Sequence, residues 1–158
     1  MPSNSKPGPP LEARIAYLLS KMGQRQATRF AELLKPLGLR PKHFALMNVV
    51  DLADGPSQQQ LGQMLGLDPS GLIRAIDELE ARGLIERRRD PSDRRRYALF
   101  LTPAGQDLLA EARAASLARG EELVAPLSDA ETKRFHDLLE RIATADEQLD
   151  LRPAADWD

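Results

Sequence analysis

Cysteine is absent from this chain of 158 residues. Its absence excludes a disulfide framework, a thiol nucleophile, a cysteine-based redox sensor and a zinc ribbon. Aromatic residues make up only 4% of the sequence, which favours helices packed through Leu, Ala and Met over an all-β sandwich. No apolar run approaches the roughly 18 residues that would cross a bilayer, so we expect no membrane partner.

The sequence also lacks the motifs of catalysis. Its two histidines, His43 and His136, lie far apart and do not have the HExxH-like spacing of a metal site. A glycine-rich phosphate loop and a nucleophile elbow are both missing. We therefore expect no metal and no cofactor, and an enzyme built on a helical pocket would have no nucleophile or acid–base pair.

The two ends of the chain differ in composition from its middle. Residues 1–10 are rich in Pro, Ser and Gly and lack the apolar segment of a secretory signal, which predicts a disordered N-terminal arm. Residues 147–158 form an acidic tail, to which we assign no structure. An apolar content of 42% suits one cytoplasmic domain with helical extensions.

Apolar residues recur at intervals of three and four over residues 11–37, and this spacing predicts one long amphipathic helix. Gly38 ends this helix as a C′ glycine. Pro41 then opens a second helix, which Gly55 and Pro56 stop. A helix as long as the first, at the edge of a small domain, usually rests part of its face on a partner chain.

Two further helices carry clear start signals. Ser57 and Gln60 have the spacing of a capping box, and Gly66 closes the short helix that they open. Asp68 and Pro69 then supply an N-cap and a first-turn proline for a helix of about four turns. Its inward residues are expected to be Leu72, Ile73, Ile76 and Leu79. Two helices joined in this way, by a short turn that contains glycine, form a helix-turn-helix.

A basic segment comes directly after the helix-turn-helix. Residues 82–96 hold seven arginines and three acids, a local charge of +4 in a chain whose net charge is −2. Two strand-like runs flank a polar turn at residues 90–93, which predicts a β-hairpin. A basic finger on an acidic body is typical of phosphate binding. A solvated charged loop is the alternative for this stretch taken alone.

The last third of the chain is helical again. Thr102 opens a helix that Pro126 ends, and a capping box at Ser128 and Glu131 opens another. The predicted order of elements is α-α-α-α-β-β-α-α. Because a helix-turn-helix followed by a hairpin is a winged helix, the predicted fold is mainly α, with a small β-hairpin wing in a winged helix-turn-helix over residues 41–101.

Several residues of this region resemble the multiple-antibiotic-resistance-regulator (MarR) family of bacterial transcription factors. The resemblance rests first on Asp93-x-Arg95, followed after five residues by Leu101-Thr102 and then by Gly105. Leu79-Glu80-x-x-Gly83-Leu84-Ile85-x-Arg87 is similar to the family's junction between recognition helix and wing. Asp68 and Leu72-x-Arg74 resemble its recognition helix. The chain departs from the family at Gly71, which lacks a side chain, and at Ile73, where Ser or Thr is common.

The resemblance implies an obligate homodimer in which a first dimerisation helix at 11–37 interlocks with C-terminal dimerisation helices at 102–146. It also implies that each subunit presents one winged helix and that the dimer binds a pseudo-palindromic operator in double-stranded DNA. In this family a small ligand, often a phenolic or aromatic acid, commonly weakens DNA binding. The expected function is thus a homodimeric repressor. A winged helix that docks its arginines onto an acidic protein is the alternative.

Candidate DNA contacts on the helix-turn-helix are Ser57, Gln58, Gln59, Pro69, Ser70, Gly71 and Arg74. On a recognition helix Arg74 would reach the major groove and grip guanine; the alternative is a surface arginine paired with Asp77 or Glu78. The first turn, at Ser70 and Gly71, offers backbone N–H groups and the helix dipole to phosphate, or is ordinary first-turn composition. Ser57 is expected to act as a cap, and the two glutamines reach phosphates or stay in solvent.

Candidate DNA contacts on the hairpin are Asp93, Arg94, Arg95 and Arg96. The arginines at the tip suit insertion into a narrow minor groove. Asp93 is placed to orient the guanidinium of Arg95. Residues 87–89 are three arginines that alternate sides along a strand, so one or two of them are expected to pair with acids on the body.

A ligand site is predicted from four residues, Arg14, Tyr17, His43 and Met47. His43 and Met47 on the second helix would line a pocket against Arg14 and Tyr17 on the first, and Arg14 would pair with the anion of an aromatic carboxylate. The alternative is that all four are ordinary helix-packing and surface residues.

Overall fold

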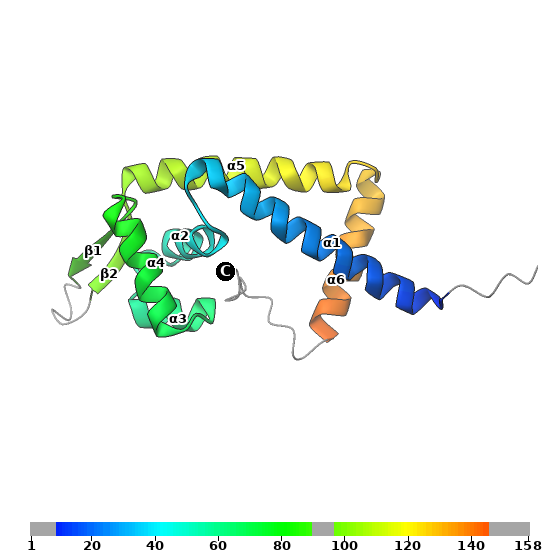
Figure 1. The fold of residues 1–158 in the computed structure, drawn as a ribbon, viewed down its shortest axis with the longest axis horizontal. Coiled ribbons are helices and arrows are strands. Elements are labelled where there is room, and N and C mark those ends of the chain that lie inside the picture. Colours follow the sequence, from blue (N-terminus) through cyan, green and yellow to red (C-terminus); the bar gives the residue numbers. More distant parts are fainter. Residues whose placement is uncertain (1–8, 90–96, 146–158) are drawn as a thin grey trace, which may run out of the picture.

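The computed structural model describes residues 9–89 and 97–145, so the N-terminal arm up to residue 8 and the acidic tail lie outside the described residues. In chain order the elements are α1 (Leu11–Leu34), the 3-10 turn η1 (Lys35–Leu37), α2 (Pro41–Ala53), α3 (Gln58–Leu65), α4 (Pro69–Ala81), β1 (Ile85–Arg89), β2 (Tyr97–Leu101), α5 (Pro103–Val124) and α6 (Asp129–Ala145). The predicted order and the mainly α fold are confirmed (Figure 1).

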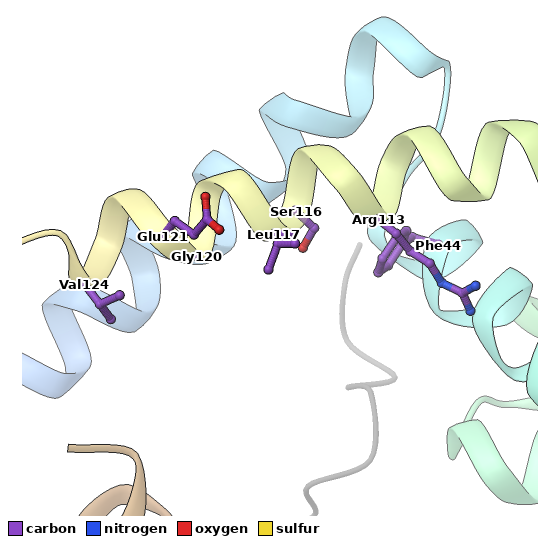
Figure 2. Close-up of a pocket in the computed structure, with 7 residues that line it drawn as sticks. All are labelled: Phe44, Arg113, Ser116, Leu117, Gly120, Glu121 and Val124. Atoms are coloured by element: carbon purple, nitrogen blue, oxygen red, sulfur yellow. The ribbon is translucent and has the colours of Figure 1, made fainter. Parts of the chain in front are cut away.

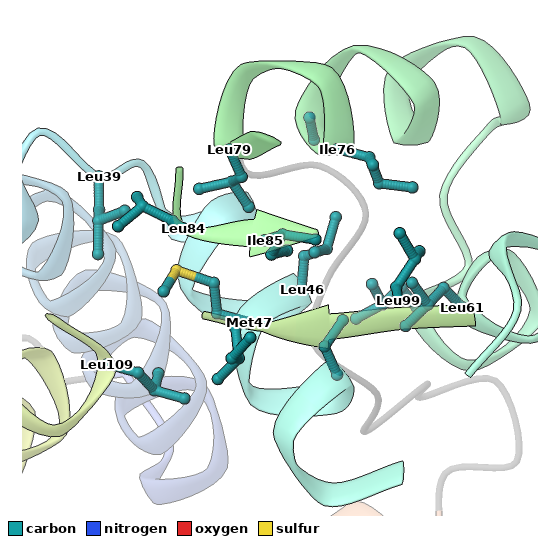
Figure 3. Packing of buried hydrophobic residues seen from close by; sticks show 14 of the residues in the cluster. Leu39, Leu46, Met47, Leu61, Ile76, Leu79, Leu84, Ile85, Leu99 and Leu109 are labelled. Carbon is teal, nitrogen blue, oxygen red and sulfur yellow. The ribbon is translucent and has the colours of Figure 1, made fainter. Parts of the chain in front are cut away.

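One apolar core joins α2, α3, α4 and the hairpin, and the start of α5 packs on it (Figure 3). Leu46 of α2, Ile76 and Leu79 of α4, Leu99 of β2 and Leu109 of α5 are at most 1% exposed. Burying a side chain of this size contributes about 1.5–3 kcal/mol. Because Ile76 and Leu79 anchor one side of α4 in this core, the opposite side of the helix faces solvent.

The hairpin is a two-stranded antiparallel sheet whose register pairs Ile85 with Leu101 and Arg89 with Tyr97. Its inner strand is tied to the start of α3, because the N–H of Leu99 donates to the carbonyl of Pro56 at 3.0 Å. The side chain of Ile85 is buried while that of Arg89 is exposed. The base of the wing is therefore part of the core, and its outer end projects from it.

The junction between wing and α5 explains one glycine of the family motif. Thr102 caps α5, since its Oγ1 accepts the N–H of Gly105 at 3.0 Å and donates to the carbonyl of Gly83 at 2.6 Å. A Cβ at Gly105 would lie 2.0 Å from the carbonyl oxygen of Leu84. A side chain at residue 105 would thus push the wing away from α5.

Away from this core the chain extends as long helices (Figure 1). In the single chain Leu34 is the one buried residue of α1, and α6 has no buried residue. The large apolar side chains left exposed on α1, α5 and α6 are Leu11, Ile15, Tyr17, Leu18, Leu19, Met22, Leu117, Leu123, Leu138 and Ile142. This is far more exposed apolar surface than the winged helix carries.

Two searches of the described residues complete the fold. No helix there is both long enough and apolar enough to span a bilayer. Within the same residues, no cluster of three or more His, Asp or Glu side chains is placed to hold a metal ion.

Candidate nucleic-acid interface

The predicted capping box at the start of α3 is present. The side-chain oxygen of Gln60 accepts the N–H of Ser57 at 2.8 Å, and the Oγ of Ser57 accepts the N–H of Gln60 at 3.3 Å. Ser57 therefore acts as a cap. Gln58 is half-buried and Gln59 is exposed, and both border a shallow cavity of about 420 Å³ between α3 and α4.

The first turn of α4 is built around Asp68, the predicted N-cap. Its Oδ1 accepts the N–H groups of Ser70 and Gly71, both at 2.9 Å, and the hydroxyl of Ser70 at 2.5 Å. The hydroxyl of Ser70 and the N–H of Gly71 hold the pKa of the Asp68 carboxyl below its usual value. The backbone N–H groups of Ser70 and Gly71 were predicted to face phosphate, but both already donate to Asp68.

Four residues share the exposed face of α4, because Ser70, Ile73, Arg74 and Asp77 are spaced by three and four along the helix. Ile73 is 42% exposed, so the expectation that it faces inward is wrong. The small, fully buried Ala75 takes its place in the inward stripe, between Leu72 and the later core positions. An isoleucine therefore lies next to Arg74 on the surface that a recognition helix presents.

Arg74 is exposed, and it forms no hydrogen bond or ion pair with any residue in 9–89 or 97–145. Both acids that were considered as its partners are engaged elsewhere. Asp77 accepts from Arg87 at 2.5 Å, and Glu78 accepts from His43 at 2.8 Å. No residue in the described part of the chain occupies the hydrogen-bond donors of the Arg74 guanidinium.

Arg87 connects β1 of the hairpin to α4. Its guanidinium pairs with both Asp77 and Glu80 of α4. One positive charge thus lies between two carboxylates, and it fixes β1 against α4. This confirms that part of the run at 87–89 pairs with acids on the body.

The other two arginines of β1 differ from each other. The Nε of Arg88 donates to Glu86 at 2.8 Å, and its guanidinium lies over the ring of Phe100, 4.6 Å from the centroid. Arg89 is exposed and forms no hydrogen bond or ion pair within the described part of the chain. The predicted tip contacts Asp93, Arg94, Arg95 and Arg96 lie outside the described residues.

A cluster that sequence reasoning missed ties α2 to α4. The Nδ1 of His43 accepts the N–H of Arg40 at 3.3 Å, its Nε2 lies 2.8 Å from the carboxylate of Glu78, and the guanidinium of Arg40 also pairs with Glu78. These partners require a neutral ring with its proton on Nε2. Burial lowers the pKa of His43, which favours that neutral form. Arg40 and Glu78 are 38 positions apart, so no local pattern could have revealed the contact.

The single chain does not bring the four residues of the predicted ligand pocket together. His43 and Met47 are 4% and 0% exposed and belong to the interior, whereas Arg14 and Tyr17 are exposed. The contact between α1 and α2 is made by Phe30, whose ring packs edge-on against Phe44 with centroids 5.3 Å apart. Arg14 precedes Phe30 by sixteen residues, which is about 24 Å of helix. Within one chain the four residues do not form a site.

The comparisons with known proteins agree with this geometry. The model of the MarR family matches residues 37–96. A predicted transcriptional regulatory protein for the hcr operon of Thauera aromatica is 34% identical over 111 residues, which are 70% of this chain and 67% of that protein. The transcriptional repressor CouR, solved bound to a 23-mer DNA duplex, is 30% identical with a TM-score of 0.70, and the match covers 81% of this chain and 91% of that one.

The PcaV transcriptional regulator of Streptomyces coelicolor, solved in complex with its natural ligand, is 26% identical with a TM-score of 0.65, over 89% of this chain and 99% of that one. The fold and the exposed face of α4 define a winged-helix transcriptional regulator. The chain belongs to the MarR family.

Proposed function

We propose that this regulator is a homodimeric repressor, which binds a pseudo-palindromic operator through α4 and the wing and leaves it when a small acid binds. The observation that carries the DNA-binding part is the isolated guanidinium of Arg74 on the outer face of α4. Of the other described arginines at residues 82–89, Arg82, Arg87 and Arg88 have a partner within the chain. Arg89, at the outer end of β1, has none among the described residues. A free guanidinium at the position of Arg74 suits the O6 and N7 acceptors of guanine.

Ser70 and Ile73 complete the base-reading surface of α4. The hydroxyl of Ser70 donates to Asp68, so its remaining capacity is to accept a hydrogen bond. Ile73 offers only apolar contact, and the apolar group in the major groove is the C5-methyl of thymine. We infer that α4 selects guanine through Arg74 and an adjacent thymine through Ile73. Gln59, the wing arginines 94–96 and Arg89 then supply phosphate or minor-groove contacts.

Support for the homodimer comes from the exposed apolar faces of α1, α5 and α6. Ile15, Leu18, Leu117 and Ile142 are 45%, 55%, 66% and 57% exposed in the single chain. Exposed apolar surface on three neighbouring helices of a protein in water is typical of an interface. A second copy supplies the same surface, which is the arrangement of a twofold dimer. The structures of CouR with DNA and PcaV with its ligand support the two states of the proposed cycle.

The test is selection of bound duplexes from a randomised DNA pool, followed by fluorescence anisotropy of the selected duplex at two salt concentrations. We expect inverted half-sites whose centres lie about 10 bp or a multiple apart, and an affinity that falls steeply with salt. Failure to bind any duplex in dilute buffer would contradict the proposed repressor. It would favour the alternative, a winged helix that docks its arginines onto an acidic protein.

A further inference from the structure

The cavity of about 420 Å³ between α3 and α4 presents apolar surface to water. Leu67 and Pro69 line it, together with the side chains of Gln58 and Gln59. Ile73 follows Pro69 by one helical turn on the same side of α4 and is also exposed. The phosphates of DNA offer no apolar group that could fill this cavity. Part of the outer face of α4 is therefore left without a matching DNA contact.

A guanidinium lies beside this apolar surface. Arg74 directly follows Ile73 and has no partner among the described residues. After the hydrogen bonds that Asp68 accepts in the first turn of α4, the nearby charge of Arg74 is a further cause of the lowered pKa of this carboxyl. The cation thus acts at the start of α4, close to the cavity. An apolar group flanked by carboxylates would match both of them.

The acidic tail at residues 147–158 has this composition. It holds four acids and one arginine, a net charge of −3, whereas residues 82–96 carry a local charge of +4. Trp157 is the only tryptophan of the chain, and Asp156 and Asp158 stand on either side of it. An indole combines a large apolar ring with one N–H donor, which the side-chain oxygen of a glutamine can accept. The tail therefore carries an apolar group between two carboxylates.

The tail is also long enough to reach α4. Figure 1 shows that α6 turns away from the far end of α5, toward the side of the molecule on which α3 lies. The helix that separates α6 from the winged helix is α5, whose 22 residues are about 33 Å long. Trp157 follows Ala145, the last residue of α6, by twelve positions, which span about 40 Å when extended.

Two cavities along α5 suit the tail less well. The first has a volume of about 540 Å³, with Phe44, Arg113 and Glu121 in its wall (Figure 2). Its arginine is already engaged, because the guanidinium of Arg113 donates to Asn48 at 2.8 Å and to Asp51 at 2.7 Å. The carboxylate of Glu121 would repel an acidic segment. This cavity has space but no spare positive charge.

The second cavity, of about 380 Å³, lies between α1 and α5 and is lined by Arg25, Arg29 and Arg119. Its charge also matches an acidic segment. However, α1 and α5 belong to the proposed dimer surface, and the 17 residues of α6 carry the chain about 25 Å along a direction that leaves α5. Docking of the tail at these arginines is the alternative that the experiment has to exclude.

We propose that the acidic tail docks on the winged helix of its own chain, with the indole of Trp157 in the cavity between α3 and α4 and a neighbouring aspartate paired with Arg74. The inference rests on the proposed function in one respect, since the docked tail covers the surface assigned to DNA. A segment tethered to the same chain acts at an effective concentration of about 1 mM. A tail that binds with a Kd of about 0.1 mM would thus lower DNA affinity about tenfold.

The first measurement is acrylamide quenching of tryptophan fluorescence in the full-length protein without DNA. Because Trp157 is the only tryptophan, this fluorescence reports on the tail alone. We expect slower quenching than in the same protein unfolded in urea. Salt at about 1 M, or Arg74→Gln, should remove most of this protection because each weakens the ion pair. Arg14→Gln, which removes an exposed arginine of α1, should leave it unchanged. Quenching equal to that of the unfolded protein would overturn the proposal.

Disulfide trapping then locates the docked tail, because the chain has no cysteine of its own. Ala155→Cys combined with Gln59→Cys should form a disulfide within one chain under mild oxidation, since docking brings the two Cα atoms within the roughly 4.4–6.8 Å that the bond requires. Ala155→Cys combined with Arg25→Cys should form it far more slowly. Faster trapping at residue 25 would place the tail between α1 and α5 and would overturn the proposal.

The last measurement is the affinity of full-length variants for duplex DNA at low salt. The neutralised tail Glu147→Gln, Asp150→Asn, Asp156→Asn, Asp158→Asn should bind about tenfold more tightly. Trp157→Ala, which changes no charge, should give part of this gain. A gain without protection of Trp157 would mean that the tail only repels DNA, which contradicts docking. Protection and trapping in a protein that binds no duplex would support docking and refute the proposed function.

Discussion

The winged helix and the outer helices of this molecule use the same residue types in opposite ways. In the winged helix, leucines and isoleucines fill a closed core, and the arginines Arg82, Arg87 and Arg88 have partners in the chain. On α1, α5 and α6, large apolar side chains face water, and Arg25 and Arg29 of α1 have no hydrogen-bond partner among the described residues.

This contrast shows where the molecule depends on something outside itself. In the described part of the winged helix, every buried side-chain nitrogen or oxygen has a hydrogen-bond partner. On the exposed faces of α4 and β1, Ile73 lies open to solvent, and Arg74 and Arg89 have no partner among the described residues. The outer helices α1, α5 and α6 each expose an apolar face to water. An apolar surface of this extent is typical of one that a partner covers. We therefore expect changes in the outer helices to act on assembly, and changes on α4 to act on DNA recognition alone.

The largest effect should come from placing a charge in the exposed apolar stripe of α1. Leu18→Asp would bury a carboxylate without a partner in the proposed interface, which should dissociate the dimer and lower operator affinity by about a thousandfold, toward non-specific binding. Ser20→Asp adds the same charge on the opposite side of α1 and is the control. Sedimentation equilibrium and anisotropy measure both effects, and a Leu18→Asp protein that stays dimeric would refute the interface.

On α4, replacement of Arg74 should have the next largest effect. Arg74→Ala should cost about 1–3 kcal/mol of operator binding and relax the preference for one base pair, because the base contact is lost. Arg82→Ala is the matched control: Arg82 donates to the carbonyls of Gly38 and Leu37 at 2.6 and 3.1 Å. Its removal should lower the free energy of unfolding by about 1 kcal/mol and leave DNA specificity unchanged. An equal loss on every duplex sequence would exclude Arg74 from base reading.

Removal of Arg87 should weaken DNA binding indirectly. Arg87→Ala leaves the carboxylates of Asp77 and Glu80 without their cation, beside a polyanion, so we expect an affinity loss of about tenfold. The double variant Arg87→Ala, Asp77→Ala should recover part of this loss, because one repelling charge is gone. If the second substitution restores nothing, Arg87 itself contacts DNA.

Ile73 should contribute less to operator binding than Arg74 and Arg87 do. Replacing the contacted thymine by uracil removes only the C5-methyl group, and it should weaken binding by about 1 kcal/mol. The Ile73→Ala protein should be indifferent to this replacement, which a double-mutant cycle on the two changes would show. Coupling close to zero would place Ile73 away from the thymine.

The smallest expected effect is on the pH dependence of the free energy of unfolding, through the contact between α2 and α4. The pKa of His43 is lowered in the folded chain, so its contribution to stability is complete above its ordinary value of 6.5 and is lost as the pH falls below it. His43→Gln should flatten the fall in unfolding free energy between pH 7 and the folded pKa of His43. His136→Gln removes an exposed histidine of α6 and should keep the wild-type profile. Denaturant titrations across this pH range give the answer.

Local rules predicted the elements well, because caps and turns are made by residues close in sequence. Ser57, Asp68 and Thr102 cap the helices that they were expected to open. The hairpin and its partial pairing of arginines also followed from spacing and charge.

The remaining features depend on contacts between distant segments. Apolar character suggested that Ile73 is buried, but the small Ala75 occupies the inner face. The direction in which α1 leaves the core separates Arg14 from His43, and no periodicity encodes that direction. For the same reason the cavity around Arg29 and Arg119 joins residues 90 positions apart.

The measurement that tests the central claim most directly is native mass spectrometry of the protein with its selected duplex. Two chains that engage adjoining half-sites predict a complex of two protomers per duplex, and a half-length duplex with one half-site should hold the protein far more weakly. A complex of one protomer per duplex, with equal affinity for the half-length DNA, would contradict the account.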